Sequence, residues 1–383
     1  MKKILGLGLS AMLLASPALA ATKIGMITTL SGGGSHLGID VRDGFMLAAK
    51  GNDMLDIVQS GRKDIEVLVE DDGRKPDVAK AIADKFIQRD KVDIMTGIIW
   101  SNLAMAVVPS TVRQGVFYLS PNAGPSKLAG KGCNANYFNV AWQNNNLHEA
   151  MGNYMKEAGL KAPFILAPNY PAGTDALAGF TSRFGPPKGQ LFTKLGQKDY
   201  AAEIARIRAS GADSVFFFLP GGMGIAFMKQ YAASGIDLPV YGPAFSFDEI
   251  ILGAVGDSAI GVKNTSQWAY DLDNPTNKAF VESFRKSYGR TPTLYASQGF
   301  DTANLILSAL KVAAPSDADA FRQALEAANF DSVRGAFKFG PNHHPIQNIY
   351  VREVVAGDGK PTNKLIGIAM ENLQDAFAAD CKL

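Results

Sequence analysis

The chain has 383 residues, and a single hydrophobic core rarely grows beyond about 250–300 residues, so we expect two domains. Hydrophobic residues make up 47% of the chain and charged residues 19%, which excludes disorder over most of its length. Lysine and arginine total 38 against 36 acidic residues. This balance lacks the basic excess of a nucleic-acid-binding surface, so we expect no nucleic-acid partner.

The first twenty residues have the pattern of a secretory signal. Two lysines follow Met1, residues 4–15 are almost entirely apolar, and small residues flank Leu19. The apolar run is shorter than the roughly 20 residues that span a bilayer. We therefore predict cleavage near Ala20 and a soluble mature chain in the periplasm. A buried N-terminal helix is the alternative interpretation of this segment.

Cys133 and Cys381 are the two cysteines of the chain. An exported chain meets an oxidising compartment, where a pair of cysteines usually forms a disulfide. We predict this bond, which would hold the C-terminus against the body of the molecule, and two separate buried thiols are the alternative. The chain has no Cys-x-x-Cys sequence, which argues against a redox or zinc-ribbon site.

Short apolar strands alternate with longer amphipathic helices through most of the chain. We predict strands at residues 22–29, 65–70, 92–99, 116–119, 163–168 and 213–219, and helices at residues 40–50, 76–89, 102–114, 147–158, 174–184, 200–210, 223–234, 274–288, 293–313 and 317–328. This alternation is typical of βαβ units and predicts an α/β fold with parallel sheets. Residues 335–339, 347–355 and 364–369 differ, because they have the pattern of antiparallel strands joined by turns.

Ligands of parallel α/β sheets bind beyond the carboxyl ends of the strands, next to helix N-termini. The segments that follow the predicted strands hold small residues, hydroxyls, amides and aromatic rings, with few titratable groups. The candidate ligand-binding residues from these segments are Ser35, His36, Leu37, Trp100, Ser101, Asn102, Asn122, Ala123, Gly124, Tyr170, Pro220, Gly221, Phe245 and Phe247. Such residues can hold a small molecule by hydrogen bonds and ring stacking, but they suit bond-making chemistry poorly.

The chain lacks the sequence patterns of the common hydrolases. It has no Gly-x-Ser-x-Gly elbow, and the pair His148 and Glu149 is not followed by the second histidine of a zincin. His343 and His344 are neighbours with no evident third ligand, so we expect them in a loop and not at a metal. We therefore expect no catalytic residue, no metal and no cofactor.

Several candidates also have a purely structural interpretation. Trp100 and Phe247 could be packing between lobes, and His36 could cap the glycine-rich turn at residues 31–37. Three phenylalanines at residues 216–218 predict a buried strand and not a ligand contact. Residues 221–224 only partly match a dinucleotide-binding turn, because the third glycine of that motif is missing.

Segments spread along the chain resemble one family of binding proteins. Residues 23–32, 120–123, 167–170, 241–243 and 295–301 are together similar to the Leu/Ile/Val-type (type I) periplasmic substrate-binding proteins of ABC importers, over essentially the whole mature chain. The resemblance implies two doubly wound parallel-sheet lobes joined by a hinge of three crossovers. The lobes it implies are residues 21–142 with 270–343, and residues 143–269 with 344–383. It also implies a monomer that delivers its ligand to an ABC permease in the inner membrane, and it adds Gln298 to the candidates.

The resemblance also carries an expectation about the ligand. In amino-acid-binding members, the ligand carboxylate meets residues that match Ser101, Asn122, Ala123 and Gly124, and an aromatic residue of the second lobe matches Tyr170. These members commonly place an acidic residue for the ligand ammonium where this chain has Ala244. Burying an unpaired ammonium costs several kcal/mol, so the change argues against an α-amino acid.

Aromatic residues near the same segments favour a flat, apolar ligand. Trp100, Phe245 and Phe247 could enclose a ring, and residues 122–126, 264–268 and 344–347 are similar to members that bind aromatic acids. We therefore predict a benzoate- or hydroxycinnamate-like ligand. A branched-chain amino acid or an amide is the alternative ligand, and a ligand sensor for a membrane receptor is the alternative function.

Overall fold

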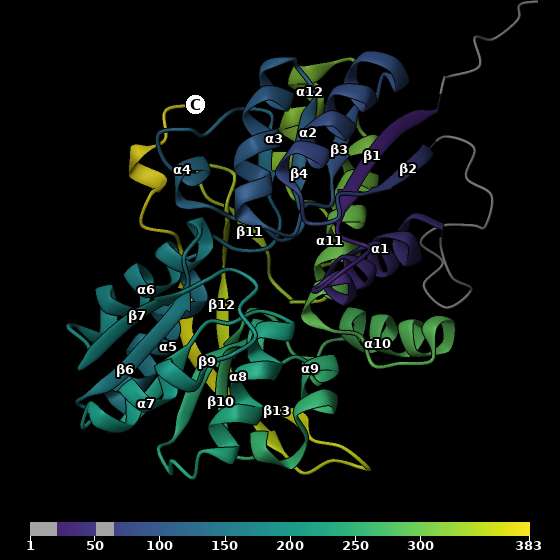
Figure 1. The fold of residues 1–383 in the computed structure, drawn as a ribbon. Coiled ribbons are helices and arrows are strands. Elements are labelled where there is room, and N and C mark those ends of the chain that lie inside the picture. Colours follow the sequence, from purple (N-terminus) through teal and green to yellow (C-terminus); the bar gives the residue numbers. More distant parts are fainter. Residues whose placement is uncertain (1–20, 51–64) are drawn as a thin grey trace, which may run out of the picture.

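The computed structural model describes residues 21–50 and 65–383, and the predicted signal segment lies outside this part of the chain. The described residues form two α/β lobes, each built around its own sheet (Figure 1). The predicted α/β fold with parallel sheets is confirmed. Below, the first lobe means the β1–β5 sheet with the helices packed on it, and the second lobe means the sheet of β6 to β13 with its helices.

The first lobe contains a five-stranded parallel sheet in the order β2-β1-β3-β4-β5. Its strands are β1 (Thr22–Thr28), β2 (Ile65–Asp71), β3 (Ile94–Thr96), β4 (Phe117–Ser120) and β5 (Tyr137–Asn139). The early helices of this lobe are α1 (Ser35–Lys50), α2 (Pro76–Lys85), α3 (Ser101–Arg113) and α4 (Ser126–Ala129). Every residue of the central strands β3 and β4 is buried, as expected for strands that are covered on both faces, and the short edge strand β5 is buried as well.

The second lobe mixes parallel and antiparallel strands. The parallel strands are β6 (Pro163–Pro168), β7 (Gly189–Thr193), β8 (Ser214–Phe217), β9 (Val240–Pro243) and β10 (Lys263–Ser266), and β11 (Lys338–Phe339), β12 (Pro345–Val355) and β13 (Thr362–Leu373) are antiparallel additions. The helices of this lobe are α5 (Asn146–Glu157), which precedes β6, and α6 (Pro171–Phe184), α7 (Ala201–Ala209), α8 (Gly222–Ala233) and α9 (Glu249–Val255). The predicted antiparallel pairing of the last three strands is confirmed.

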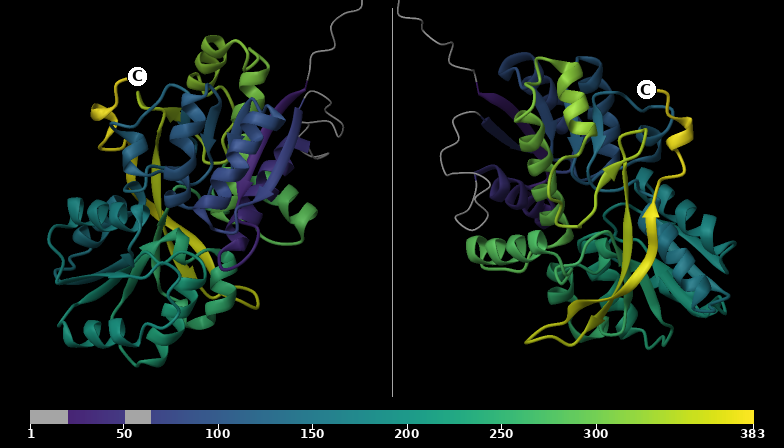
Figure 2. Two further views of the ribbon diagram at one scale, coloured as in Figure 1. Left: turned by 45° about the horizontal axis from the view of Figure 1, so that its top comes forward. Right: turned by 180° about the vertical axis from the view of Figure 1, so that it is seen from behind.

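Three late helices return to the first lobe (Figure 2). They are α10 (Pro275–Tyr288), α11 (Leu294–Leu310) and α12 (Ala318–Glu326). Helix α11 lies very close to α1, because two glycines allow the backbones to meet. A Cβ on Gly44 would lie 1.9 Å from the carbonyl oxygen of Ala296, and one on Gly299 would lie 2.0 Å from that of Val41.

A buried arginine ties the chain segments between the lobes together. Arg334 pairs with Asp301 of α11 at 3.0 Å and donates to the carbonyl oxygens of Val140 and Ala141 and to Gln347 Oε1. Val140 and Ala141 open the first passage between the sheets, and Gln347 lies on β12, after the third. Removing one partner of a fully buried ion pair is strongly destabilising. Arg334 therefore holds the segments at residues 140–141 and 347, which pass between the lobes, against α11 of the first lobe.

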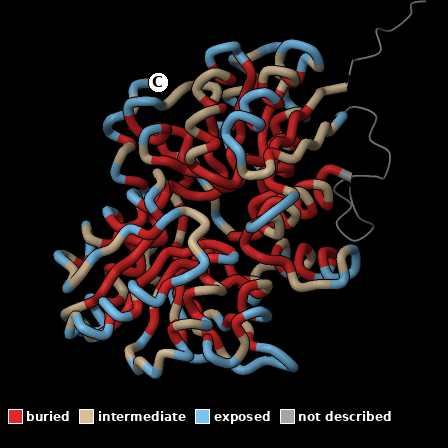
Figure 3. The backbone as a smooth tube through the Cα atoms, viewed as in Figure 1, coloured by how far each residue is buried: buried red, intermediate tan, exposed pale blue. Residues whose placement is uncertain are grey.

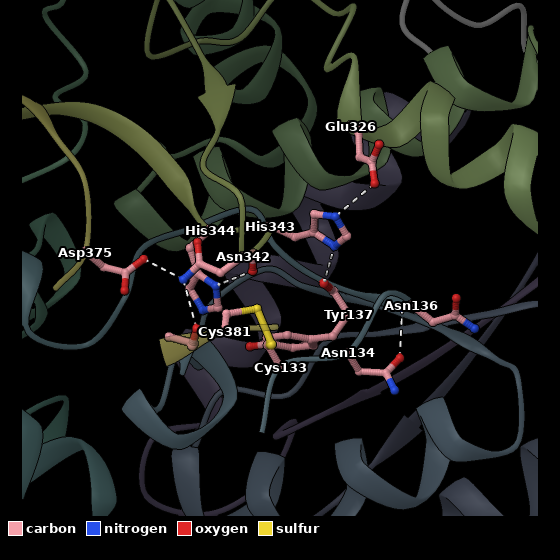
Figure 4. Close-up of a disulfide and its surroundings, with 11 residues drawn as sticks. Cys133, Asn134, Asn136, Tyr137, Glu326, Asn342, His343, His344, Asp375 and Cys381 are labelled. Carbon is pink, nitrogen blue, oxygen red and sulfur yellow. Dashed lines mark hydrogen bonds and ion pairs between the residues drawn. A yellow bond between two sulfur atoms is a disulfide. The ribbon is translucent and has the colours of Figure 1, made fainter. Parts of the chain in front are cut away.

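The predicted disulfide between Cys133 and Cys381 is confirmed, with the two Cα atoms 5.7 Å apart (Figure 4). It holds the C-terminal tail, which follows β13, against the loop after α4. In the same region, Asn342 Nδ2 donates to Asp375 Oδ2 at 2.8 Å. The last ten residues therefore lie on the first lobe, whereas the predicted boundaries group residues 344–383 with the second. Those boundaries stay a prediction.

The start of α1 differs from the prediction. The turn expected at residues 31–37 is shorter, because Gly32 and Gly34 adopt positive φ and the helix begins at Ser35, five residues before the predicted start. Leu37 is buried together with Val41 and Phe45, so the apolar face of the helix extends back to the end of β1. Figure 3 shows buried residues along the central strands of both sheets and at the boundary between the lobes.

Candidate functional site

A cavity lies between the two lobes. It is lined by Leu37, Ile99, Trp100, Ser101, Asn122 and Ala123 from the first lobe, by Trp142, Asn144 and His148 near the first passage, by Tyr170, Ala172, Phe218, Pro220 and Phe245 from the second lobe, and by Tyr295 from α11. The lining is mostly apolar and aromatic with a few polar groups, as is usual for small-molecule sites. The site therefore fits a small molecule that contacts both lobes.

Aromatic rings form a continuous wall around this cavity. The ring of Tyr170 lies 6.4 Å from that of Trp100 and is stacked with that of Phe218 at 6.3 Å. Phe245 lies 5.5 Å from Phe218 and 4.6 Å from Trp142, again between ring centroids. These separations fall within the range of favourable ring contacts. A planar ring bound here would face aromatic surfaces from both lobes.

Hydrogen bonds from two neighbouring strand ends fix the indole of Trp100. Its Nε1 donates to Thr29 Oγ1 at 3.0 Å, and the Thr29 hydroxyl in turn donates to Asp72 Oδ1 at 2.6 Å. The guanidinium of Arg74 lies over the indole, 5.3 Å from its centroid, as a cation–π contact. Trp100 is therefore held in one orientation by the residues that follow β1 and β2.

Ser101 places a hydroxyl at the start of α3, beside the cavity. Asn144 Nδ2 donates to Ser101 Oγ at 3.1 Å, which leaves the hydroxyl proton of Ser101 free to donate elsewhere. Trp100 precedes this 13-residue helix and gives it no side-chain cap. The hydroxyl and the positive end of the helix dipole together favour an anionic group of a ligand.

The other polar side chains of the cavity are uncharged. Burial lowers the pKa of His148 to about 3, so its imidazole is neutral at neutral pH. Its Nδ1 and the Oδ1 of Asn122 are buried, and neither has a hydrogen-bond partner among the described residues. Burial also raises the pKa of the Tyr170 hydroxyl. No lysine, arginine, aspartate or glutamate is among the residues that line the cavity.

The structure brings many of the candidate residues together. The candidates that line the cavity are Leu37, Trp100, Ser101, Asn122, Ala123, Tyr170, Pro220 and Phe245. The candidates that lie outside its lining are Ser35, His36, Asn102, Gly124, Gly221, Phe247 and Gln298. His36 faces Gly221 of the opposite lobe, since a Cβ there would lie 3.4 Å from His36 Cε1. Phe247 packs against Phe217 inside the second lobe, with ring centroids 5.1 Å apart.

Several lining residues were not among the candidates. They are Ile99, Trp142, Asn144, His148, Ala172, Phe218 and Tyr295. Trp142, Asn144 and His148 belong to the passage between the lobes and the start of α5, so they do not follow a predicted strand as the candidates do. Phe218 corrects the interpretation of residues 216–218 as a buried strand alone, because β8 ends at Phe217 and the next ring faces the cavity.

Comparison with known proteins identifies the family. The family model described as "Periplasmic binding protein" matches residues 21–360. The chain belongs to the periplasmic binding protein family. Among curated relatives, "Leu/Ile/Val-binding protein homolog 6" of Brucella melitensis is 29% identical, and the match covers 96% of each chain. The resemblance to Leu/Ile/Val-type binding proteins is thereby confirmed, and proteins of this family bind solutes and are not enzymes.

Two solved structures of the family are especially similar to this one. The solute-binding protein of an ABC transporter from R. palustris, in complex with benzoate, has a TM-score of 0.87 and 31% identity, and the match covers 95% of this chain and 100% of that one. A solute-binding protein from Rhodopseudomonas palustris BisB5, in complex with 3,4-dihydroxybenzoic acid, has a TM-score of 0.83 and 28% identity, covering 93% and 99%.

The adjacent histidines have separate surroundings in the described structure. The ring of His343 is stacked on Phe138 with centroids 4.0 Å apart. His343 Nε2 also lies 3.0 Å from Glu326 Oε1, while His344 contacts the ring of Tyr137 (Figure 4). Over residues 21–50 and 65–383, no three His, Cys, Asp or Glu side chains are grouped so that they could hold a metal ion. None of the helices in these ranges has the length and apolar character that a bilayer crossing requires.

Proposed function

We propose that this protein binds a small aromatic carboxylate between its lobes and delivers it to an ABC permease. The observation that carries the proposal is the composition of the cavity wall, which joins six aromatic side chains to neutral polar groups and holds no charged side chain. A planar ring gains ring contacts and apolar burial in such a wall. The relatives solved with benzoate and with 3,4-dihydroxybenzoic acid support the same ligand class.

We place the ligand carboxylate at the start of α3. The Ser101 hydroxyl has a free proton there, and the helix dipole adds a favourable field. Asn122 and Ala123 lie next to this position in the cavity wall. Gly124, also expected at the carboxylate, instead donates its N–H to Asn144 Oδ1 at 3.2 Å, so its role is to hold Asn144.

The cavity gives an α-amino acid no partner for its ammonium group. The position that follows the Tyr241–Pro243 segment is Ala244, which is fully buried, and Phe245 and not a carboxylate reaches the cavity. Burying an ammonium without a counter-charge costs several kcal/mol. The curated relatives named for Leu/Ile/Val binding keep the amino acid as the second candidate, and it is tested beside the aromatic acid.

In this proposal the protein performs no chemistry. Residues 1–20 direct export, and the mature protein works in the periplasm as a monomer. A ligand that contacts both lobes stabilises the closed form over the open form, and the permease recognises the closed form. The affinity for the ligand therefore depends on contacts that exist only after closure.

Isothermal titration of benzoate into the refolded protein tests this function. Phe245 contacts Phe218, Trp142 and Tyr295 at the cavity, so Phe245→Ala should weaken benzoate binding by about 10- to 100-fold. Phe192→Ala is the matched control, because Phe192 is exposed on β7 and does not line the cavity. Equal affinities of wild type and Phe245→Ala, or no binding of benzoate and its hydroxylated analogues, would contradict the proposal.

A further inference from the structure

One carboxylate of the second lobe holds the first lobe at the cavity edge. Asp175 lies on α6, and its Oδ1 accepts from the Ser126 hydroxyl at 2.7 Å while its Oδ2 accepts from the Ser126 backbone N–H at 3.0 Å. Ser126 is the first residue of α4, which belongs to the first lobe (Figure 1). Pro125 before it offers no side-chain acceptor, so Asp175 takes the place of an N-cap residue from across the boundary.

The same carboxylate is connected to the cavity through Asn144. Asn144 Nδ2 donates to Asp175 Oδ2 at 2.9 Å and to Ser101 Oγ at 3.1 Å, and Asn144 Oδ1 accepts from the Gly124 N–H at 3.2 Å. Both amide protons and the amide oxygen of Asn144 are therefore used to join Ser101 and Gly124 of the first lobe to α6 of the second.

We propose that Asp175 is a positioning residue that couples closure of the lobes to the orientation of Ser101. When the lobes separate, Asp175 loses Ser126, and Asn144, which Asp175 holds in place beside α5 of the second lobe, loses Ser101 and Gly124. The Ser101 hydroxyl is then free to turn away from the cavity. Because coupling between two events is reciprocal, a ligand held by Ser101 stabilises the Asp175 contacts, and those contacts slow its release.

The coupling rests on lobe closure and not on the identity of the ligand. Asp175 does not line the cavity, so its loss should weaken every ligand by the same factor and leave the ratio of affinities between ligands unchanged. Charge-assisted hydrogen bonds are about twice as strong as neutral ones, so Asp175→Asn should increase the dissociation rate roughly 10-fold or more. A residue that touches the ligand would instead change that ratio.

Fluorine NMR of protein labelled with 5-fluorotryptophan measures closure directly. The chain has three tryptophans, and two of them, Trp100 and Trp142, line the cavity. Trp268 is buried away from the cavity, so its resonance serves as the internal reference. Asp175→Asn should shift the Trp100 and Trp142 resonances toward the open form even without ligand, and leave Trp268 in place. Asp237→Asn, an exposed acid of the second lobe, is the control for lost charge.

Stopped-flow dissociation of benzoate completes the test, with Ser126→Ala and the double variant as a mutant cycle. The proposal predicts that the double variant releases benzoate no faster than Asp175→Asn. If Asp175→Asn folds poorly, Ser126→Ala alone should still release benzoate faster than the wild type. Additive effects, or unchanged resonances and release rates in both single variants, would overturn it. If benzoate does not bind at all, the proposed function fails, but the ligand-free resonances still decide on Asp175.

Discussion

At the scale of single residues, position along the chain predicted the site better than residue type. Trp100, Ser101 and Tyr170 follow strands, and strand ends of parallel sheets meet at one edge, so their place in the cavity could be predicted. Phe245 and Phe247 are similar in sequence context, yet one faces the cavity and the other the core. Sequence could not separate them, because the short 3₁₀ turn at Ala244–Ser246 decides which ring faces the ligand.

The imidazole of His148 makes a prediction about acid stability. Burial lowers its pKa from 6.5 to about 3, so between these values the unfolded chain binds a proton that the folded chain does not. The stability contributed by neutral His148 is present above pH 6.5 and is lost as pH falls toward 3, at about 1.4 kcal/mol per pH unit.

Urea unfolding of wild type and His148→Phe at pH 7 and pH 5 measures this contribution. The wild type should lose about 2 kcal/mol more than the variant between the two pH values, since the groups other than His148 are common to both proteins. The difference between the two proteins at each pH is the informative quantity. An offset that is the same at pH 7 and pH 5 would show that His148 titrates normally.

At the scale of elements, periodicity predicted most helices and most strands but missed others, among them α9, β7 and β10. β10 has the polar sequence Lys263–Ser266 and is central in its sheet, where hydrogen bonds such as that from Thr265 to the Leu147 carbonyl satisfy its side chains. β7 is an edge strand whose residues are mostly accessible, so it lacks the continuous apolar run of the other parallel strands. Both depend on tertiary neighbours that local patterns do not report.

The contact between α1 and α11 makes a prediction for a matched pair of glycines. Gly299→Ala would place a methyl group 2.0 Å from the Val41 carbonyl oxygen, so the helices must separate, at a cost of about 1–3 kcal/mol or more. Gly253→Ala on the exposed face of α9 meets no close atom and should stabilise by about 0.5–1 kcal/mol. Thermal unfolding of both variants checks the signs, and a neutral Gly299→Ala would contradict the close approach.

At the scale of the whole molecule, the family resemblance supplied what local patterns could not. Alternating strands and helices predicted parallel sheets, but only the resemblance indicated that α10 to α12 rejoin the first lobe before the chain returns to the second. The contact of the C-terminal tail with the first lobe could be predicted from the two cysteines, because an exported chain with a single pair of cysteines can form only one internal disulfide.

The disulfide makes a prediction for the tail that follows β13. Cys381→Ser should free the tail from the loop after α4, and removing a native disulfide typically costs about 2–5 kcal/mol. Hydrogen exchange should rise in residues 126–133 and 374–383 and remain unchanged in β6 and β8. Exchange that stays slow in the tail of the variant would show that contacts such as Asn342 with Asp375 hold it without the bond.

We propose that the cavity selects an aromatic carboxylate over an α-amino acid. The most direct test is calorimetric titration of the same unfolded and refolded protein with 4-hydroxybenzoate and with leucine, so that no carried-over ligand remains. This proposal predicts binding of the aromatic acid and no measurable heat with leucine, because no lining side chain can pair with an ammonium. Tight binding of leucine, with no response to 4-hydroxybenzoate, would contradict it.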